Sequence, residues 1–215
     1  MIPACPDRSL VNSAIYWDAA ALRAALPALA EAYAQAGVKA SIVWTHDDER
    51  EAIAALEAAG YRFDGSPAAM YLELADLGGH QPGELDWDDE ASTEEVGRVN
   101  DLAYGFAAGE GPGPAIGFGP PELPTRYYRA LVGGRTASVL GTIDVEGDCM
   151  IVWVSTLPED RGRGLAAGLL GAALHDASER GLRTSTLQAS MLGRGVYERL
   201  GYRVAARFQL YERRQ

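Results

Sequence analysis

One stretch of the chain strongly limits how it can fold: an apolar run ends at a proline, and a turn rich in glycine and arginine leads into a helix. The run covers Met150 to Leu157, the proline is Pro158, and the turn and helix start extend to Leu170. Backbone N–H groups at a helix start have no intrahelical partner, and the helix dipole adds partial positive charge there. Glycines let an anion approach these groups closely. The stretch therefore predicts a strand–turn–helix unit that cradles a diphosphate-bearing ligand.

Length and charge narrow the class of protein. A chain of 215 residues, 47% of them hydrophobic, can bury a sizeable core as one large domain or two small ones. The net charge of -11 argues against a phosphate-backbone partner, which needs a basic surface, so we expect no nucleic-acid binding. Acidity favours solubility, and it is a weaker indication of a cationic small substrate.

Cysteine and histidine usage favours a reduced, cytoplasmic protein without a metal. Cys5 and Cys149 form neither a disulfide framework nor a C-x-x-C site. His46, His80 and His175 share no metal-ligand spacing. No apolar run approaches the roughly 18 residues that span a bilayer, and no signal-peptide pattern occurs, so we expect no membrane partner.

A glycine-rich segment over residues 76–83 is typical of a linker and divides the chain into parts 1–78 and 84–215. In the first part we expect helices over 18–35 and about 48–59, the second capped by Asp47 or Asp48. Gly37 and Gly60 end these helices. Strands are expected over 40–45, 61–64 and 69–74.

The second part opens with a capping box, Ser92-Thr93-Glu94-Glu95, which starts a helix that reaches about residue 104. Residues 105–121 are dense in glycine and proline, so we expect no regular structure there, in a segment that is either functional or mobile. Three strands connected by tight turns follow, over 127–132, 135–145 and 148–156. A helix over 164–180, a strand over 183–189, a short helix over 194–200 and a strand over 203–211 complete the order.

Two other nucleotide-binding folds also have a glycine-rich turn before a helix, and their motifs can be compared with this one. A P-loop requires a lysine after the glycines, and none is present. Gly162-Arg163-Gly164 followed by Leu165-Ala166-Ala167 approaches the fingerprint of a dinucleotide-binding oxidoreductase, but a preceding antiparallel meander does not suit a doubly wound sheet. That function is disfavoured but stays open.

Two motifs together resemble the GCN5-related N-acetyltransferase (GNAT) family. Arg161-Gly162-Arg163-Gly164-Leu165-Ala166 is similar to the family's acetyl-CoA signature, Arg/Gln-x-x-Gly-x-Gly/Ala. Tyr197-Glu198-Arg199-Leu200-Gly201-Tyr202 is similar to its Tyr-x-x-x-Gly-Phe/Tyr element. The resemblance covers about residues 84–213. It implies an α+β fold in which a mixed, mostly antiparallel central sheet is flanked by helices.

The resemblance also implies an activity: an N-acetyltransferase that transfers acetyl from acetyl-CoA to a primary amine of a small-molecule acceptor, by direct attack in a ternary complex. The diphosphate would lie on the turn, helped by two arginine side chains. The pantetheine arm would pair with the end of the strand before the turn, because in this fold that strand and the next splay apart. Many members carry an asparagine where this chain has Ser190. The implied cofactor-binding residues are Val154, Ser155, Thr156, Arg161, Gly162, Arg163, Gly164, Leu165, Ala166, Ala167 and Ser190.

Tyr197 is the expected general acid, because a nearby phenol can protonate the departing CoA thiolate. The segment 105–121 would lie over the acceptor, as the corresponding segment does in the family. The sequence does not single out a general base, and positioning with desolvation can suffice without one. Asp144, Glu146 and Asp148 are expected to be solvated near a hairpin end, and His175 is expected on an exposed helix face. The candidates for the base are Glu110, Asp144, Glu146 and Asp148.

The first part resembles the second half of such a domain. Leu56-Glu57-Ala58-Ala59-Gly60-Tyr61-Arg62 aligns with the element that starts at Tyr197, but leucine replaces that tyrosine and no acetyl-CoA signature precedes it. We therefore expect a degenerate half-domain with a structural role in extending the sheet, shaping the acceptor pocket or forming a dimer surface.

The alternative from another functional class is a non-catalytic acyl-CoA-binding or sensor module. The acceptor, the acyl length and the oligomeric state stay open, although homodimers are common in the family.

Overall fold

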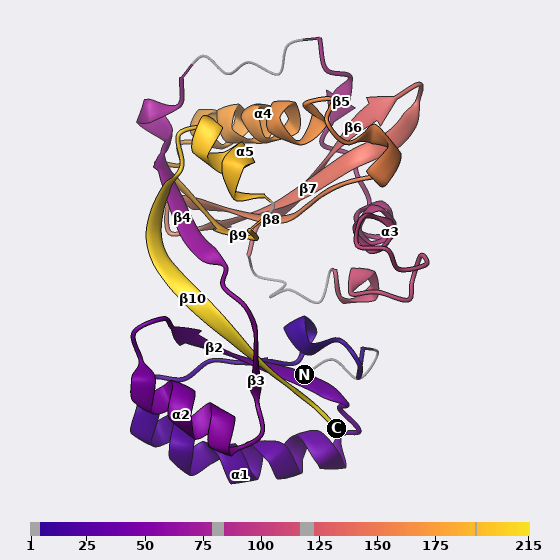
Figure 1. Ribbon diagram of the computed structural model, residues 1–215. Helices are drawn as coiled ribbons and strands as arrows, with labels where there is room; N and C mark the ends of the chain where they lie inside the picture. Colours follow the sequence, from indigo (N-terminus) through magenta and orange to yellow (C-terminus); the bar gives the residue numbers. More distant parts are fainter. Residues whose placement is uncertain (1–4, 79–83, 117–122, 192) are drawn as a thin grey trace. The chain divides into compact units, whose positions relative to one another are not determined.

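The chain forms two compact units, and the last residues of the sequence belong to the first of them. A computed structural model describes residues 5–78, 84–116, 123–191 and 193–215. Unit 1 comprises Met1–Ala68 and Ala206–Gln215, and unit 2 comprises Ala69–Ala205 (Figure 1). Much of the expected linker, residues 79–83, lies outside the described residues. The expected boundaries 1–78 and 84–215 therefore stay a prediction, whereas the compact units divide inside the last strand.

Unit 1 packs two helices against a small mixed sheet with the strand order β1-β2-β10-β3. Asp18 caps α1 as its Oδ1 accepts the N–H of Ala21 at 2.8 Å. Leu22, Leu56 and Val43 bring α1, α2 and β2 into one buried cluster. Its elements are β1 (Ser13–Ala14), α1 (Ala19–Gln35), β2 (Ala40–His46), α2 (Arg50–Ala58), β3 (Arg62–Gly65) and most of β10 (Arg203–Arg214).

The expected cap of the second helix is wrong. The residue that caps α2 is Glu49, and its side chain makes no capping hydrogen bond. Asp48 instead accepts the Arg50 N–H through its backbone carbonyl, at 2.9 Å. Both helices of unit 1 end as expected, since Gly37 and Gly60 have φ values of 68° and 87°, which favour glycine after a helix end.

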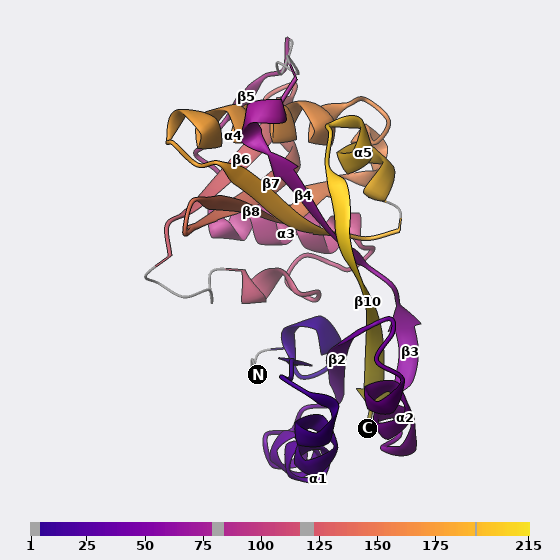
Figure 2. The ribbon, with the colours of Figure 1, turned by 90° about the vertical axis from the view of Figure 1, so that its left-hand side faces the viewer.

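Unit 2 is a six-stranded mixed sheet with the order β4-β9-β8-β7-β6-β5. Strands β5 to β8 pair antiparallel in sequence order, and β8 pairs with β9 in parallel. Helices α3 and α4 cover opposite faces of this sheet (Figures 1 and 2). The elements are β4 (Ala68–Glu73), β5 (Trp87–Asp88), α3 (Thr93–Ala103), β6 (Thr125–Val132), β7 (Arg135–Val145), β8 (Asp148–Thr156), α4 (Leu165–Glu179), β9 (Thr184–Ala189) and α5 (Arg194–Arg199).

Local sequence chemistry explains these boundaries. The capping box forms as predicted: Ser92 Oγ accepts the Glu95 N–H at 3.1 Å, and Glu95 Oε2 accepts the Ser92 N–H at 3.2 Å. Gly133 and Gly134 both have positive φ, as a tight hairpin turn requires. The expected α+β fold, a mixed sheet flanked by helices, is confirmed.

No helix among the described residues combines the length and apolar character needed to cross a membrane.

Candidate active site

The two parallel strands at the centre of unit 2 separate before they end. The β8–β9 ladder pairs Asp148 to Ile151 with Thr184 to Leu187, and then stops. Strand β8 nevertheless continues to Thr156 and remains paired with β7 on its other side. The last residues of β8 therefore present one edge of backbone N–H and C=O groups toward the space that β9 leaves.

A bulge lies where the strands part. Between the pairs Val152–Gly141 and Ser155–Val139, two residues of β8 oppose one of β7. Trp153 lies in this bulge with φ 56°, an uncommon conformation for an aromatic residue. Bulges bend a strand and redirect its edge. The departure of β8 from β9 is thus built into the backbone at Trp153.

The glycine turn follows directly on this strand. Gly162 and Gly164 have φ 76° and 78°, and a Cβ at either would meet no atom within 4 Å, so open space faces the turn. Gly164 is the N-cap of α4. Across the described residues, no intramolecular partner engages the backbone N–H groups from Gly162 to Ala167. We call these six residues the cradle, and their geometry suits an anion.

Arg163 in the cradle and Arg161 just before it have partners within the protein. Arg163 Nη1 donates to Asp160 Oδ1 at 2.7 Å. Arg161 donates to two backbone carbonyls, those of Thr156 and Ala103. The expected role of both side chains in holding a diphosphate stays a prediction.

Asp160 is a site residue that sequence reasoning missed. It is only 3% exposed, and it accepts a second 2.7 Å bond from Arg135 on β7. Hydrogen bonding to Arg135, with a smaller contribution from Arg163, lowers the pKa of its carboxyl below the ordinary aspartate value. The carboxylate joins the start of β7 to the cradle. In the sequence, the signal for this role was that Asp160 lies close to two arginines, Arg161 and Arg163. Its other partner, Arg135, is distant in the sequence and could not be inferred.

Tyr197 lies in α5 and is 8% exposed. Burial, with a smaller electrostatic contribution from Tyr104 at the end of α3, raises its pKa to about 12. Its ring packs edge-on against Tyr202, with centroids 6.0 Å apart. The hydroxyl makes no hydrogen bond within the described part of the chain. It therefore stays protonated near neutral pH and is free to donate.

Ser190 stabilises the turn that leads into α5 through hydrogen bonds. Its Oγ accepts the N–H of Gly193 at 3.2 Å, and its carbonyl accepts the Arg194 N–H at 3.1 Å. These bonds fasten the turn into α5. A contact of Ser190 with a cofactor stays a prediction.

The predicted strand residues divide between two faces of the sheet. Ser155 is buried toward α3, where its Oγ accepts a bond of 2.8 Å from Asn100. Thr156 points to the other face, where it shares a bond of 2.8 Å with Ser138. Their carbonyl oxygens also accept bonds within the protein, that of Ser155 from Ser138 Oγ at 3.0 Å and that of Thr156 from Arg161 Nε at 3.3 Å. Val154 lies in the bulge between Val152 and Ser155.

The segment after α3 is more ordered than predicted. It contains a turn of 3-10 helix, Gly113–Ala115. The fully buried carboxylate of Asp101 accepts the N–H groups of Gly109 and Gly113 at 2.8 and 2.7 Å. A Cβ on Gly113 would lie 2.5 Å from the carbonyl oxygen of Gly97, so the segment packs directly on the helix backbone. Residues 117–121 of the predicted acceptor segment lie outside the described residues.

The expected exposure is wrong for two candidate bases and for His175. Asp144 is not solvated, because it pairs bidentately with Arg180. Asp148 accepts hydroxyl bonds from two threonines of β9 at 2.7 and 2.6 Å. His175 is half-buried, and its Nε2 is buried without a hydrogen-bond partner among the described residues. Glu146 and Glu110 are exposed.

The part of the chain that contains this site is similar to a known family of domains. Residues 135–205 match the profile of the acetyltransferase (GNAT) domain. The match begins at Arg135 and contains β7, β8, the cradle, β9 and α5. The chain contains a GNAT domain. No curated protein matches the sequence.

Solved structures share the fold of this chain at low sequence identity. A GCN5-related N-acetyltransferase from Kribbella flavida is 20% identical, with 93% of this chain and 77% of that chain covered and a TM-score of 0.68. One from Sphaerobacter thermophilus is 19% identical, with 89% and 68% covered and a TM-score of 0.64. A tandem GNAT protein from the clavulanic acid biosynthesis pathway is 14% identical, with 89% and 69% covered and a TM-score of 0.62.

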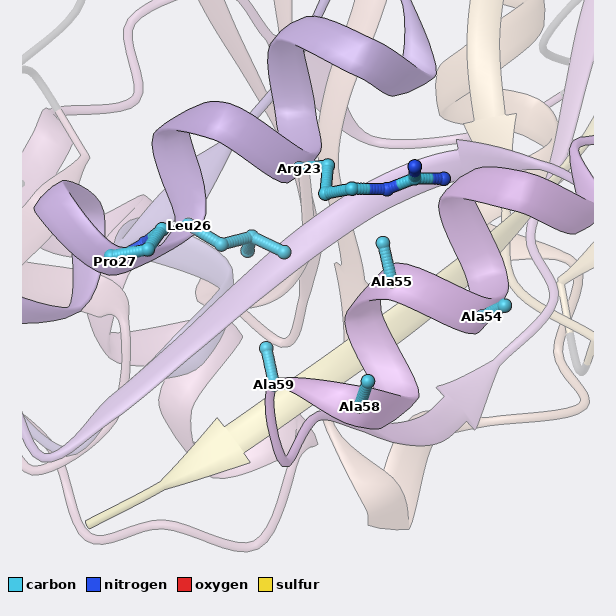
Figure 3. A pocket seen from close by; sticks show the side chains of 7 residues that line it. All are labelled: Arg23, Leu26, Pro27, Ala54, Ala55, Ala58 and Ala59. Carbon is cyan, nitrogen blue, oxygen red and sulfur yellow. The ribbon is translucent and has the colours of Figure 1, made fainter.

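Unit 1 has a groove of its own, of about 430 Å³. The side chains that line it are mostly small and apolar, and the guanidinium of Arg23 lies at one side (Figure 3). None of the predicted site residues lines it. Within the described residues, no cluster of His, Cys, Asp or Glu could hold a metal ion. The groove residues are Arg23, Leu26, Pro27, Ala54, Ala55, Ala58 and Ala59.

Proposed function

We propose that unit 2 transfers the acetyl group of acetyl-CoA to a primary amine of a small-molecule acceptor. One observation carries the proposal: the β8–β9 ladder stops after Ile151, and the part of β8 that β9 leaves unpaired leads directly to the cradle. A ligand with an amide-bearing arm and a diphosphate at its end matches both features. Acetyl-CoA has this chemistry, and the GNAT domain match supports it.

The cradle would bind the diphosphate through backbone N–H groups and the N-terminal end of α4. A side chain at Gly162 or Gly164 would fill the space that an anion needs. The edge of Val154, Ser155 and Thr156 would pair with the amides of the arm, as an added strand pairs with a sheet edge. This pairing would hold the thioester near the bulge at Trp153.

The chemical step is an attack of the neutral amine on the thioester carbonyl. A C–N bond forms, the C–S bond breaks, and the sulfur leaves with the bonding electrons. Tyr197 would protonate this sulfur, because its raised pKa keeps the phenol protonated at neutral pH. The amine also loses a proton, and with Asp144 and Asp148 engaged in strong bonds, we assign its removal to solvent.

Unit 1 would have a structural role as a degenerate half-domain. Leu56 replaces the tyrosine in the helix that aligns with α5, and no cradle precedes it. The tandem GNAT protein among the similar structures supports an origin of this kind. A cytoplasmic location and homodimer formation are parts of the same proposal.

Two measurements test the proposal. Calorimetry with CoA should show binding to the full chain. A thiol-release assay with acetyl-CoA and a panel of amines should then show turnover with at least one small amine. Absence of CoA binding would overturn the proposal. Binding without thiol release across the panel would instead favour a non-catalytic acyl-CoA sensor, which keeps the cradle without the chemistry.

A further inference from the structure

Arg161 directly precedes the cradle, but its side chain is bound elsewhere in the protein. Its Nε donates to the carbonyl oxygen of Thr156 at 3.3 Å, and its Nη2 donates to that of Ala103. Thr156 is the last residue of β8, and Ala103 is the last residue of α3. One guanidinium therefore ties the end of the strand to the end of the helix. The negative end of the α3 dipole makes this a favourable position for a cation.

The end of α3 also carries a phenol and a carboxylate that interact with other parts of unit 2. Tyr104 caps the helix, is 64% exposed, and contributes to the raised pKa of Tyr197. Asp101, one turn earlier, holds the backbone of Gly109 and Gly113. A shift of this helix end would move Tyr104 and residues 105–113 together.

We propose that Arg161 is a positioning residue for the acceptor: it fixes the end of α3, and with it Tyr104 and the segment 105–113, beside the reacting centre. This inference rests on the proposed acetyl transfer. The diphosphate is bound by backbone N–H groups of the cradle, so the Arg161 side chain contributes little to its affinity. Its effect is on the use of the acceptor rather than on binding of the cofactor.

Arg161→Gln tests the assignment, with Arg203→Gln as a matched control. Arg203 is an exposed arginine of unit 2 whose partner is Asp76 at 3.1 Å. Hydrogen exchange of the free protein should show faster exchange for the amides of residues 104–113 in Arg161→Gln, and no change in the control. Unchanged exchange in Arg161→Gln would overturn the proposal without any need for a known acceptor.

Ligand measurements then separate the acceptor from the cofactor. In Arg161→Gln we expect the Kd for CoA to change by less than about twofold. We expect kcat/KM for the acceptor to fall about 10- to 100-fold, as misplacement of a positioning element does. Arg161→Lys should recover part of this loss, because an ammonium can reach a carbonyl but lacks the fork that spans two.

The opposite result in Arg161→Gln would overturn the proposal. If CoA bound tenfold or more weakly while the acceptor KM stayed unchanged, Arg161 would be a diphosphate ligand. Failure of the wild-type protein to bind CoA would count against the proposed function itself, and it is visible before any variant is made.

Discussion

Tyr197 and Tyr202 are joined twice: the Tyr202 N–H donates to the Tyr197 carbonyl at 3.1 Å, and the two rings pack edge-on. The turn between them passes through Gly201, whose φ of 96° reverses the chain. Tyr202 is anchored in the core by a 2.6 Å bond to Ser185 on β9. The position of the Tyr197 ring is thus set by a strand as well as by its own helix.

Unit 1 repeats this turn without the phenol. The Tyr61 N–H donates to the Leu56 carbonyl at 3.0 Å, and Gly60 has φ 87°. Tyr61 is 1% exposed and Leu56 is fully buried. The matching backbone supports the proposal of a degenerate copy, and leucine in this position can pack but cannot donate a proton.

Tyr197→Phe tests the general acid. The change removes the hydroxyl and keeps the ring, so we expect kcat to fall about 10²-fold or more while the Kd for CoA is retained. Because its pKa is about 12, Tyr197 stays protonated up to high pH, and wild-type kcat should show no alkaline loss from its ionisation below about pH 10. Tyr61→Phe serves as a control in the matching turn of unit 1. Unchanged turnover in Tyr197→Phe would remove it from the mechanism.

Gly164→Ala tests the cradle. Gly164 has φ 78°, so alanine there is strained, and its methyl group occupies the space in front of the N–H groups. Gly181, just after the other end of α4, has φ 85° and equally open surroundings. Gly181→Ala should therefore cost similar stability, about 1 kcal/mol, and leave CoA binding intact. Equal loss of CoA binding in both variants would show that strain, rather than the cradle, is responsible.

Asp160→Asn tests the carboxylate behind the cradle. A group whose pKa is lowered on folding stabilises the protein above its unfolded pKa, and this contribution is lost as the pH falls through the folded value. We expect a clearly lower Tm than wild type at pH 7 and convergence of the two well below the ordinary aspartate pKa of about 3.9. Asp89→Asn, which removes an exposed partner 3.9 Å from Arg126, should have almost no effect at either pH. A constant difference across the pH range would contradict the assignment.

Gly113→Ala tests the packing of the segment after α3. The added methyl group would meet the Gly97 carbonyl at 2.5 Å and the Asp101 carboxylate at 2.7 Å. We expect a loss of about 1–3 kcal/mol in the free energy of unfolding, measured by urea titration. Pro114→Ala, at an exposed neighbour, should cost much less. Wild-type stability in Gly113→Ala would mean that the segment is not held on the helix.

Truncation after Ala205 tests whether unit 1 needs the last strand. The deletion removes the strand that pairs with both β2 and β3, together with the buried Tyr211. We expect the amides of β2 to lose their protection from hydrogen exchange. Deletion of Gln215 alone, which removes one bond to Lys39, should leave them protected. Protection of β2 in the longer truncation would show that residues 1–68 fold without β10.

The sequence by itself determined the local elements of this protein and the main motifs of its site. Capping at Ser92, glycine turns such as Gly60, and the proline and glycines before α4 act over a few residues, so their patterns predict the helices and the cradle directly. The same holds for Tyr197, because its motif is contiguous. The α+β fold and the GNAT domain were both predicted from those motifs taken together.

Tertiary structure decided what depends on residues far apart in the chain. The point where β8 leaves β9 depends on strand register, which no local pattern records. The buried Asp160 pairs with Arg135 of β7, and Asp144, which was expected to be solvated, pairs with Arg180 at the end of α4. The end of β10 belongs to unit 1 although it closes the sequence, because its backbone bonds are completed by β2 and β3. Hydrogen bonds and ion pairs between distant residues have no fixed spacing, and only the folded chain brings their partners together.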